Sequence, residues 1–169
     1  MQTFLPYPNF PMCAKVLDDK RLGKQRVEAK QILNILEGKS KSKAWVNHPA
    51  VRMWRKNEHV LKHYINTMIK EWINRGFENN MEFEEVDPEI LYSPRRLFDR
   101  KLHLSHRARL LKKNPKHYGQ YWKAKDPNAP YWWPVPLKNS SKNKEMVDYW
   151  RARQEKEEKE KEKSKHAVH

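Results

Sequence analysis

The apolar positions of this chain follow a helical repeat most clearly between residues 49 and 75. They recur there at alternating steps of three and four residues, which places them on one side of an α-helix. We therefore predict one long amphipathic helix, with Pro49 near its start and Gly76 near its end. The row consists of Val51, Trp54, Glu58, Leu61, Ile65, Met68 and Trp72, in which Glu58 is the polar member.

A second helical repeat precedes this one. Residues 4–11 contain three prolines within six positions, so we predict an extended arm with aromatic anchors there. From about Met12 the pattern becomes helical, and Gly38 is expected to end the helix. The apolar positions that carry this prediction are Leu22, Ala29, Leu33 and Leu36.

Two further helices are predicted in the second half of the chain. Ser93 suits a helix N-cap and Pro94 the first helical position, so a third helix should run from there to about Lys113. Residues 117–122 could form a short fourth helix. An aromatic, proline-rich loop follows over residues 130–136.

No segment shows convincing strand alternation, so the predicted fold class is all-α. We expect residues 1–138 to form a compact single domain of three to four helices, with the extended N-terminal arm and the aromatic C-terminal loop. Residues 139–169 are rich in Lys and Glu and almost free of apolar side chains. We predict that they form a charged tail, either disordered or a solvated helix.

The charge of the chain is strongly positive and unevenly placed. Its 36 Lys and Arg stand against 21 Asp and Glu, for a formal charge of +15. Residues 1–57 carry 12 basic against 4 acidic side chains and residues 95–138 carry 12 against 2, whereas residues 58–94 carry 3 against 8. This pattern predicts one basic face on the folded domain. Nucleic acid is the first candidate partner, and an anionic membrane surface is the second.

Several classes of protein are disfavoured. The single cysteine, Cys13, allows no internal disulfide and no thiolate-rich zinc site. No window is apolar enough to span a membrane, and the N-terminus lacks the layout of a signal peptide, so an intracellular, non-secreted protein is expected. His103 and His106 are three residues apart, but no third ligand completes a metal-binding spacing. We therefore expect no metal and no cofactor.

The first helix contains the most suggestive polar cluster. Arg21, Lys24 and Glu28 share one helix face, because they are separated by three and four residues. A carboxylate among cations has its charged form favoured, and it does not add to phosphate affinity. The alternative is an ordinary surface pair between Lys24 and Glu28.

The later basic and aromatic residues leave similar alternatives. The cations of residues 103–113 could line a phosphate-facing strip, or they could be a solvated surface over inward-facing leucines. His48 at a helix start could contact a phosphate or base, or could be structural. The exposed rings among residues 118–133 could stack on bases, although Trp54 and Trp72 are expected in the core.

Six blocks occur in order along residues 1–134: MQTFLPYP, RLGKQRVE, HPAVRMW, EWINRG, SHRARLL and YWWP. Together they resemble a microbial group of the pyrimidine-dimer DNA glycosylases, the phage endonuclease V type. That resemblance implies a mainly helical enzyme without metal or cofactor. It combines glycosylase and abasic-site lyase steps through an N-terminal amine and a helix carboxylate.

Carried onto this chain, the resemblance makes Glu28 the carboxylate and the α-amine of Met1 the nucleophile. An α-amine titrates near 7.7–8.0, so part of it is neutral at physiological pH. The family exposes a threonine amine, whereas residue 2 here is Gln, whose long side chain should hinder removal of Met1. Lys20 or Lys24 could act in place of the Met1 amine, or the lyase step could be absent.

These observations predict a monomeric repair enzyme acting on double-stranded, damaged DNA. The alternatives are a non-catalytic DNA-binding module of the same fold and, with less support, a metal-dependent nuclease. The residues expected at the DNA are Arg21, Lys24, Arg26, Lys30, His48, Arg52, His106, Arg107, Arg109, Lys112, Tyr118 and Trp133.

Overall fold

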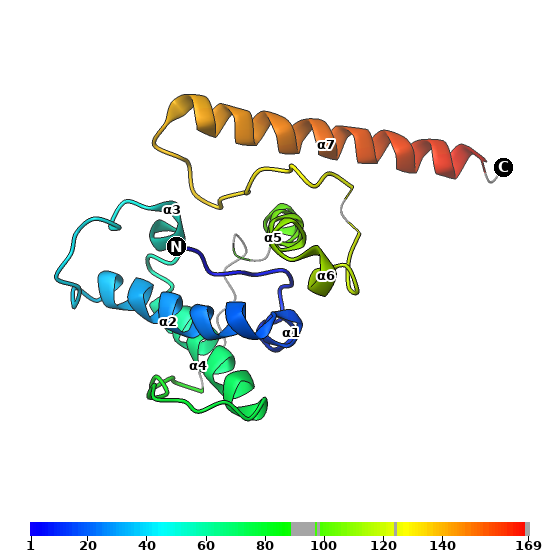
Figure 1. The fold of residues 1–169 in the computed structure, drawn as a ribbon. Helices are drawn as coiled ribbons and strands as arrows, with labels where there is room; N and C mark the ends of the chain where they lie inside the picture. The colour runs from blue at the N-terminus through cyan, green and yellow to red at the C-terminus, as the bar shows by residue number, and fades with distance from the viewer. Residues whose placement is uncertain (89–96, 98, 124, 168–169) are drawn as a thin grey trace.

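A computed structural model describes residues 1–88, 97, 99–123 and 125–167, and it confirms the all-α prediction. Throughout these residues the regular secondary structure is helical (Figure 1). The helices are α1 (Phe10–Val16), α2 (Asp19–Leu36), α3 (Pro49–Arg52), α4 (Glu58–Asn74), α5 (Arg100–Lys113), α6 (Pro115–Tyr118) and α7 (Ser140–Ala167). None of them is long and apolar enough to cross a membrane.

The first predicted helix is divided in two. Leu17 has an extended backbone with ψ of 136°, which ends α1, and the Asp18 side chain then accepts a hydrogen bond from the backbone N–H of Arg21 and caps α2. Phe10 and Pro11 belong to α1, so the extended arm is shorter than predicted. Gly38 follows the end of α2 with a positive φ of 72°, as expected of a helix-ending glycine.

The prediction of one helix over residues 49–75 is wrong. The chain turns between α3 and α4, where Lys56 has a left-handed φ of 66° that a helix cannot accommodate. Glu58 accepts a hydrogen bond from the backbone N–H of Lys56, which explains the polar residue in the apolar row. Val51 and Trp54 remain buried on the other side of the turn. The apolar spacing therefore continues although the helix does not.

The third helix ends at Lys113, as predicted, but its described part begins at Arg100. Asp99 is its N-cap and accepts a hydrogen bond from the backbone N–H of Lys101 at 2.8 Å. The predicted start at residues 93–94 lies outside the described residues. The short helix that follows begins at Pro115 rather than at residue 117, because proline is favoured in the first turn of a helix.

The core forms where α2 packs on α4, with α1 beside them and α5 above (Figure 1). A close approach of α2 and α4 depends on Gly23, because a Cβ atom there would lie 3.0 Å from the indole ring of Trp72. The N-terminal arm runs between α2 and α5, and Thr3 and Leu5 are fully buried. The arm is therefore an internal element of the domain.

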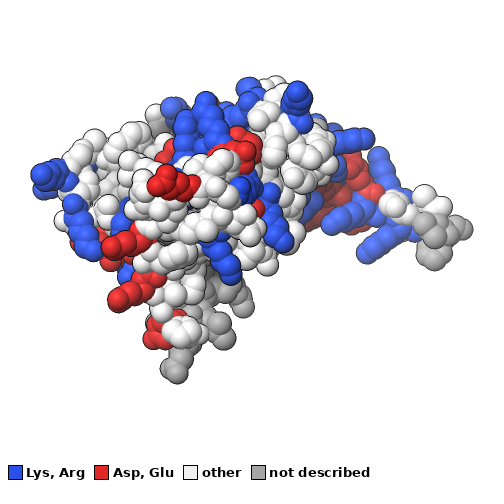
Figure 2. All heavy atoms as spheres, turned by 60° about the horizontal axis from the view of Figure 1, so that its bottom comes forward, with Lys and Arg blue, Asp and Glu red and all other residues white. Residues whose placement is uncertain are grey.

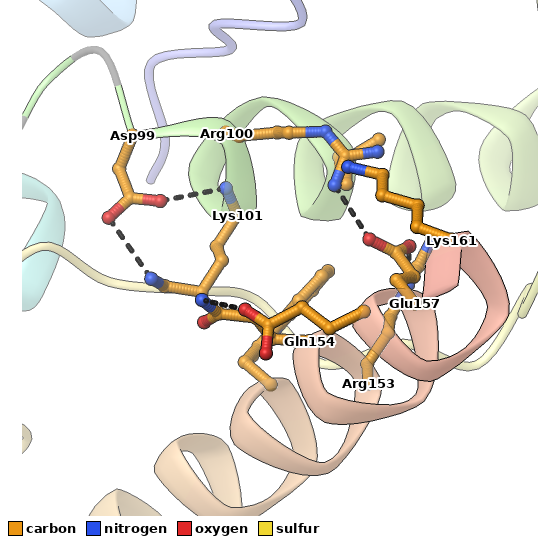
Figure 3. Close-up of a pocket in the computed structure, with 10 residues that line it drawn as sticks. Asp99, Arg100, Lys101, Arg153, Gln154, Glu157 and Lys161 are labelled. Carbon is orange, nitrogen blue, oxygen red and sulfur yellow. Dashed lines mark hydrogen bonds and ion pairs between the residues drawn. The ribbon is translucent and has the colours of Figure 1, made fainter. Parts of the chain in front are cut away.

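The last helix, α7, crosses over α5 (Figure 1). Its first turns bury Met146 and Trp150 in a small cluster with Ala108 and Ala129. Figure 3 shows the groove between the two helices, in which Arg100 contacts Glu157 at 2.7 Å. Beyond that contact the helix is exposed, and basic and acidic side chains alternate along its projecting end (Figure 2).

Candidate functional site

The N-terminal arm is held by side chains from distant helices. The amide of Gln25 on α2 lies between two arm residues: it donates to the Gln2 carbonyl at 2.9 Å and accepts from the Phe4 N–H at 2.7 Å. The Tyr64 hydroxyl on α4 lies 2.7 Å from Gln25 Oε1 and 2.9 Å from the Phe4 carbonyl oxygen. All three groups are buried, so these bonds fix the backbone of the arm.

Two histidines on α5 complete the arm's backbone bonds. The Nδ1 atom of His106 accepts from the Leu5 N–H at 2.7 Å, while the Nδ1 atom of His103 lies 2.7 Å from the Leu5 carbonyl. The two neutral rings must therefore have opposite tautomers. Burial, and secondarily the neighbouring His103, lower the pKa of His106 to about 3. Burial also lowers the pKa of His103.

The arm places the N-terminus beside Glu28. Glu28 Oε2 accepts from the backbone N–H of Gln2 at 3.3 Å and from Gln25 Nε2 at 3.3 Å. The Met1 amine lies roughly 3 Å from that Gln2 nitrogen, as standard backbone bond lengths require. Burial, followed by the positive charge of the N-terminus, lowers the pKa of His48, so His48 lies within electrostatic range of the amine.

Cations from α2 and α5 lie on one surface around this carboxylate. The pKa of Lys113 is lowered first by burial and then by the positive charges of Arg21 and Arg109, with a smaller effect of Lys24. Glu28 opposes the shift. Lys113 is therefore close enough to interact with each of the other four side chains.

The aromatic loop borders the same surface. The guanidinium carbon of Arg109 lies 4.7 Å from the centre of the Tyr131 ring, and Trp133 lies 5.4 Å beyond. The edge of Trp133 then contacts His48 at a ring separation of 5.8 Å. Tyr131 and Trp133 are half-buried, so part of each ring remains accessible beside the amine.

Three residues that were predicted to contact DNA bind other protein groups away from Glu28. Arg26 donates to Asn79 at 2.8 Å and covers the Trp72 ring at 4.4 Å. Lys30 pairs with Glu84, and Arg52 donates to the Pro136 carbonyl at 2.6 Å. These contacts attach the acidic segment and the aromatic loop to the helices.

Two other predicted contacts need correction. His106 and Tyr118 are fully buried, so neither side chain lies at the surface where a phosphate or base is met. Tyr118 instead hydrogen-bonds Asp18 at the start of α2. Arg107 donates to the Pro6 carbonyl at 2.8 Å and lies over the Tyr7 ring, whereas Lys112 is exposed.

Several residues of the candidate site were not predicted from the sequence: Gln25, Trp54 as a polar contact, Tyr64, and His103 as an arm contact. Trp54 Nε1 donates to Thr3 Oγ1 at 2.9 Å inside the domain. For Gln25 there was a usable signal, since it lies three residues from both Leu22 and Glu28 and so falls on the inner edge of α2. Each of the other residues lies far along the sequence from the arm residue that it contacts, so no local pattern indicates the contact.

The described part of the chain contains no group of three or more His, Cys, Asp or Glu side chains that could hold a metal ion. Cys13 is buried beneath the arm, and burial raises the pKa of its thiol to about 12. That thiol is therefore protonated and unsuited to nucleophilic attack at neutral pH.

Comparison with known protein families matches residues 1–85 to the pyrimidine dimer DNA glycosylases. The match includes the arm, α2 with Glu28, and α4. No curated protein and no solved structure shows significant similarity to the chain.

Proposed function

The chain belongs to the pyrimidine dimer DNA glycosylase family, and from this membership we propose that it removes the damaged pyrimidine through the Met1 amine and Glu28. The family gives the chain a DNA-repair function of the glycosylase type and a DNA substrate. We propose beyond this that Met1 supplies the nucleophile, that Glu28 is the catalytic carboxylate, and that a lyase step follows.

The observation that carries the proposal is the contact between Glu28 and the Gln2 N–H at 3.3 Å. It brings a carboxylate beside the N-terminal amine, and the buried bonds of Gln25, Tyr64 and His106 hold the arm in that position. Such an arrangement reduces the reorganisation needed when the amine attacks. A disordered terminus would have to be ordered in every reaction cycle.

The proposed reaction forms a covalent intermediate. The neutral amine attacks C1′ of the damaged nucleotide, and the electrons of the glycosidic bond leave with the base, which gains a proton. Loss of the amine proton and opening of the sugar ring then give a Schiff base between C1′ and the α-nitrogen. Removal of a C2′ proton expels the 3′ phosphate, and water releases the amine. Glu28 stabilises the developing positive charge or transfers protons.

The surface around Glu28 supplies the means of holding DNA. Arg21, Lys24, Arg109 and Lys113 suit contacts with phosphates, while Tyr131 and Trp133 offer ring faces to an exposed base. Binding through such cations releases counterions, so affinity should fall steeply as salt is raised.

The nucleophile can be identified by trapping. A duplex with one cyclobutane dimer is incubated with the protein and borohydride, which reduces a Schiff base to a stable adduct. Trypsin then separates the candidates, because residues 1–15 form one peptide without the amines of Lys20 and Lys24. We expect the adduct on the α-amine of that peptide. An adduct on a lysine would identify that lysine, rather than Met1, as the nucleophile. The absence of any adduct or strand cleavage would contradict the lyase proposal.

Substitution of Glu28 distinguishes the proposed enzyme from the alternative, a non-catalytic DNA-binding module. Glu28→Gln should slow cleavage of the glycosidic bond at the dimer by roughly 100-fold or more while leaving DNA affinity unchanged or higher. The matched control is Glu37→Gln at the exposed end of the same helix, which should behave like the wild type. Equal activity of Glu28→Gln and the wild type would show that Glu28 is not the catalytic carboxylate.

A further inference from the structure

The segment between α2 and α3 has the composition of a DNA-contacting loop. Lys39, Lys41 and Lys43 alternate with Ser40 and Ser42, and all five side chains are exposed. Trp45 follows them, with 43% of its surface exposed. Cations interleaved with an accessible ring can contact phosphates while the ring stacks on a base.

The base of this loop is anchored, although its cations are free of the core. The Trp45 carbonyl accepts from the His48 N–H at 3.0 Å, and the Val46 carbonyl accepts from Arg55 Nη2 at 2.7 Å. Upstream, the Ser42 hydroxyl accepts from the Ala44 N–H at 3.2 Å. Trp45 is therefore held in position by its backbone while its ring stays accessible.

The Trp45 ring continues the row of aromatic rings that borders the candidate site. Its centre lies 5.2 Å from the ring of His48, and the His48 ring lies 5.8 Å from Trp133. His48 also lies within electrostatic range of the N-terminal amine. An unbroken series of rings thus leads from Tyr131 through Trp133 and His48 to Trp45.

We propose that Trp45 is the residue that stacks into duplex DNA at the lesion and holds the damaged nucleotide away from its neighbours, with the adjacent lysines on the strand's phosphates. This inference rests on the proposed function and adds the residue that opens the duplex. A base inside a duplex hides C1′ from an attacking amine, and unstacking costs free energy that an inserted ring offsets.

Two other exposed apolar rings, Phe77 and Phe83, lack these features. Phe77 stacks on Trp72 at 4.3 Å, and Phe83 lies in the acidic segment between Glu82 and Glu84. A single exposed aromatic ring is common on protein surfaces and does not by itself indicate a binding site. Trp45 differs because of its lysine neighbours and its contact with His48, and Phe83 is its natural control.

The first test uses binding alone and does not depend on catalysis. A duplex carrying 2-aminopurine opposite the dimer reports unstacking as a rise in fluorescence. We expect the rise with wild-type protein and with Trp45→Phe, and its loss with Trp45→Ala at saturating protein. Phe83→Ala should give the wild-type rise. The same rise with Trp45→Ala, or no rise with wild type at saturation, would overturn the proposal.

The second test compares two substrates under single-turnover conditions. Trp45→Ala should slow cleavage of the glycosidic bond at the dimer roughly 10-fold or more. It should process a pre-formed abasic site at the wild-type rate, because that site holds no base to unstack. An equal slowing on both substrates, or none on either, would reject the stacking role. If the wild type processes neither substrate, the proposed function fails, whereas the fluorescence test still decides the role of Trp45.

Discussion

The N-terminal arm and helix α7 are stabilised in opposite ways. The arm makes no regular secondary structure, yet residues 2–6 are buried and their backbone groups bond side chains up to 101 residues away. Helix α7 satisfies its own backbone along 28 residues, yet only Met146 and Trp150 are buried on it. Regular local structure is therefore a poor guide to which part of this protein is held in place. The arm lies in the candidate site, and the long helix projects from the domain.

The largest effect should come from removing the central arm contact. Gln25→Leu leaves the Phe4 N–H and the Gln2 carbonyl without partners inside the core, and each buried unpaired group costs about 1–3 kcal/mol. We expect a loss of roughly 3–5 kcal/mol in the free energy of unfolding by urea titration, together with loss of glycosidic-bond cleavage at the dimer. Gln31→Leu, at an exposed position of α2, is the control. A loss below about 1 kcal/mol would show that the arm does not depend on Gln25.

Acid should weaken the arm next. The pKa of the buried His106 is about 3 when folded, below the ordinary value near 6.5. Below pH 6.5 the His106 imidazole therefore binds a proton in the unfolded chain but not in the folded chain. Stability then falls by roughly 1 kcal/mol for each pH unit until the pH approaches 3.

The pH test needs a side chain that accepts the same bond without titrating. His106→Asn can offer an amide oxygen to the Leu5 N–H. Urea titrations at pH 7 and pH 5 should show the wild type losing roughly 1–2 kcal/mol more than this variant. The same loss in both proteins would assign the acid sensitivity to other groups.

Loosening α7 should have the smallest consequence for the site. Trp150→Ala removes the main buried ring of the helix, but the helix can detach while the rest of the domain stays folded. We expect a loss of no more than about 2 kcal/mol in the free energy of unfolding. Amide exchange should be faster only in residues 140–167, and glycosidic-bond cleavage at the dimer should be unchanged. Arg100→Ala, which removes the exposed ion pair with Glu157, should cost under about 1 kcal/mol. Loss of activity with Trp150→Ala would show that α7 supports the site.

The sequence predicted helix content better than helix boundaries. Apolar spacing and the glycines at 38 and 76 located the inner faces and the ends of α2 and α4. The same spacing failed at Lys56, because a turn can bring the chain back with its apolar side still facing the core. Asp18 was a capping residue inside the predicted first helix, and that local signal could have divided it.

The candidate site was only partly predictable, for a different reason. Charge and spacing predicted that Arg21, Lys24 and Arg109 lie near one another, and all three act electrostatically on Lys113. The network around the arm did not, since Gln25, Tyr64 and His103 meet it through contacts that no local pattern records. His106 was predicted to contact DNA because its side chain is basic. A neutral imidazole can equally form hydrogen bonds inside the domain, and this is the form that burial favours at His106.

The bond between Leu5 and His106 also has a consequence for synthesis. These residues are 101 positions apart, so the first segment to leave the ribosome must wait for one of the later helices before it can settle. Until α5 has emerged, the arm lacks its bonds to His103 and His106, although Gln25 and Tyr64 can already bind it. A nascent chain should therefore hold its N-terminus beside Glu28 less firmly until α5 has formed.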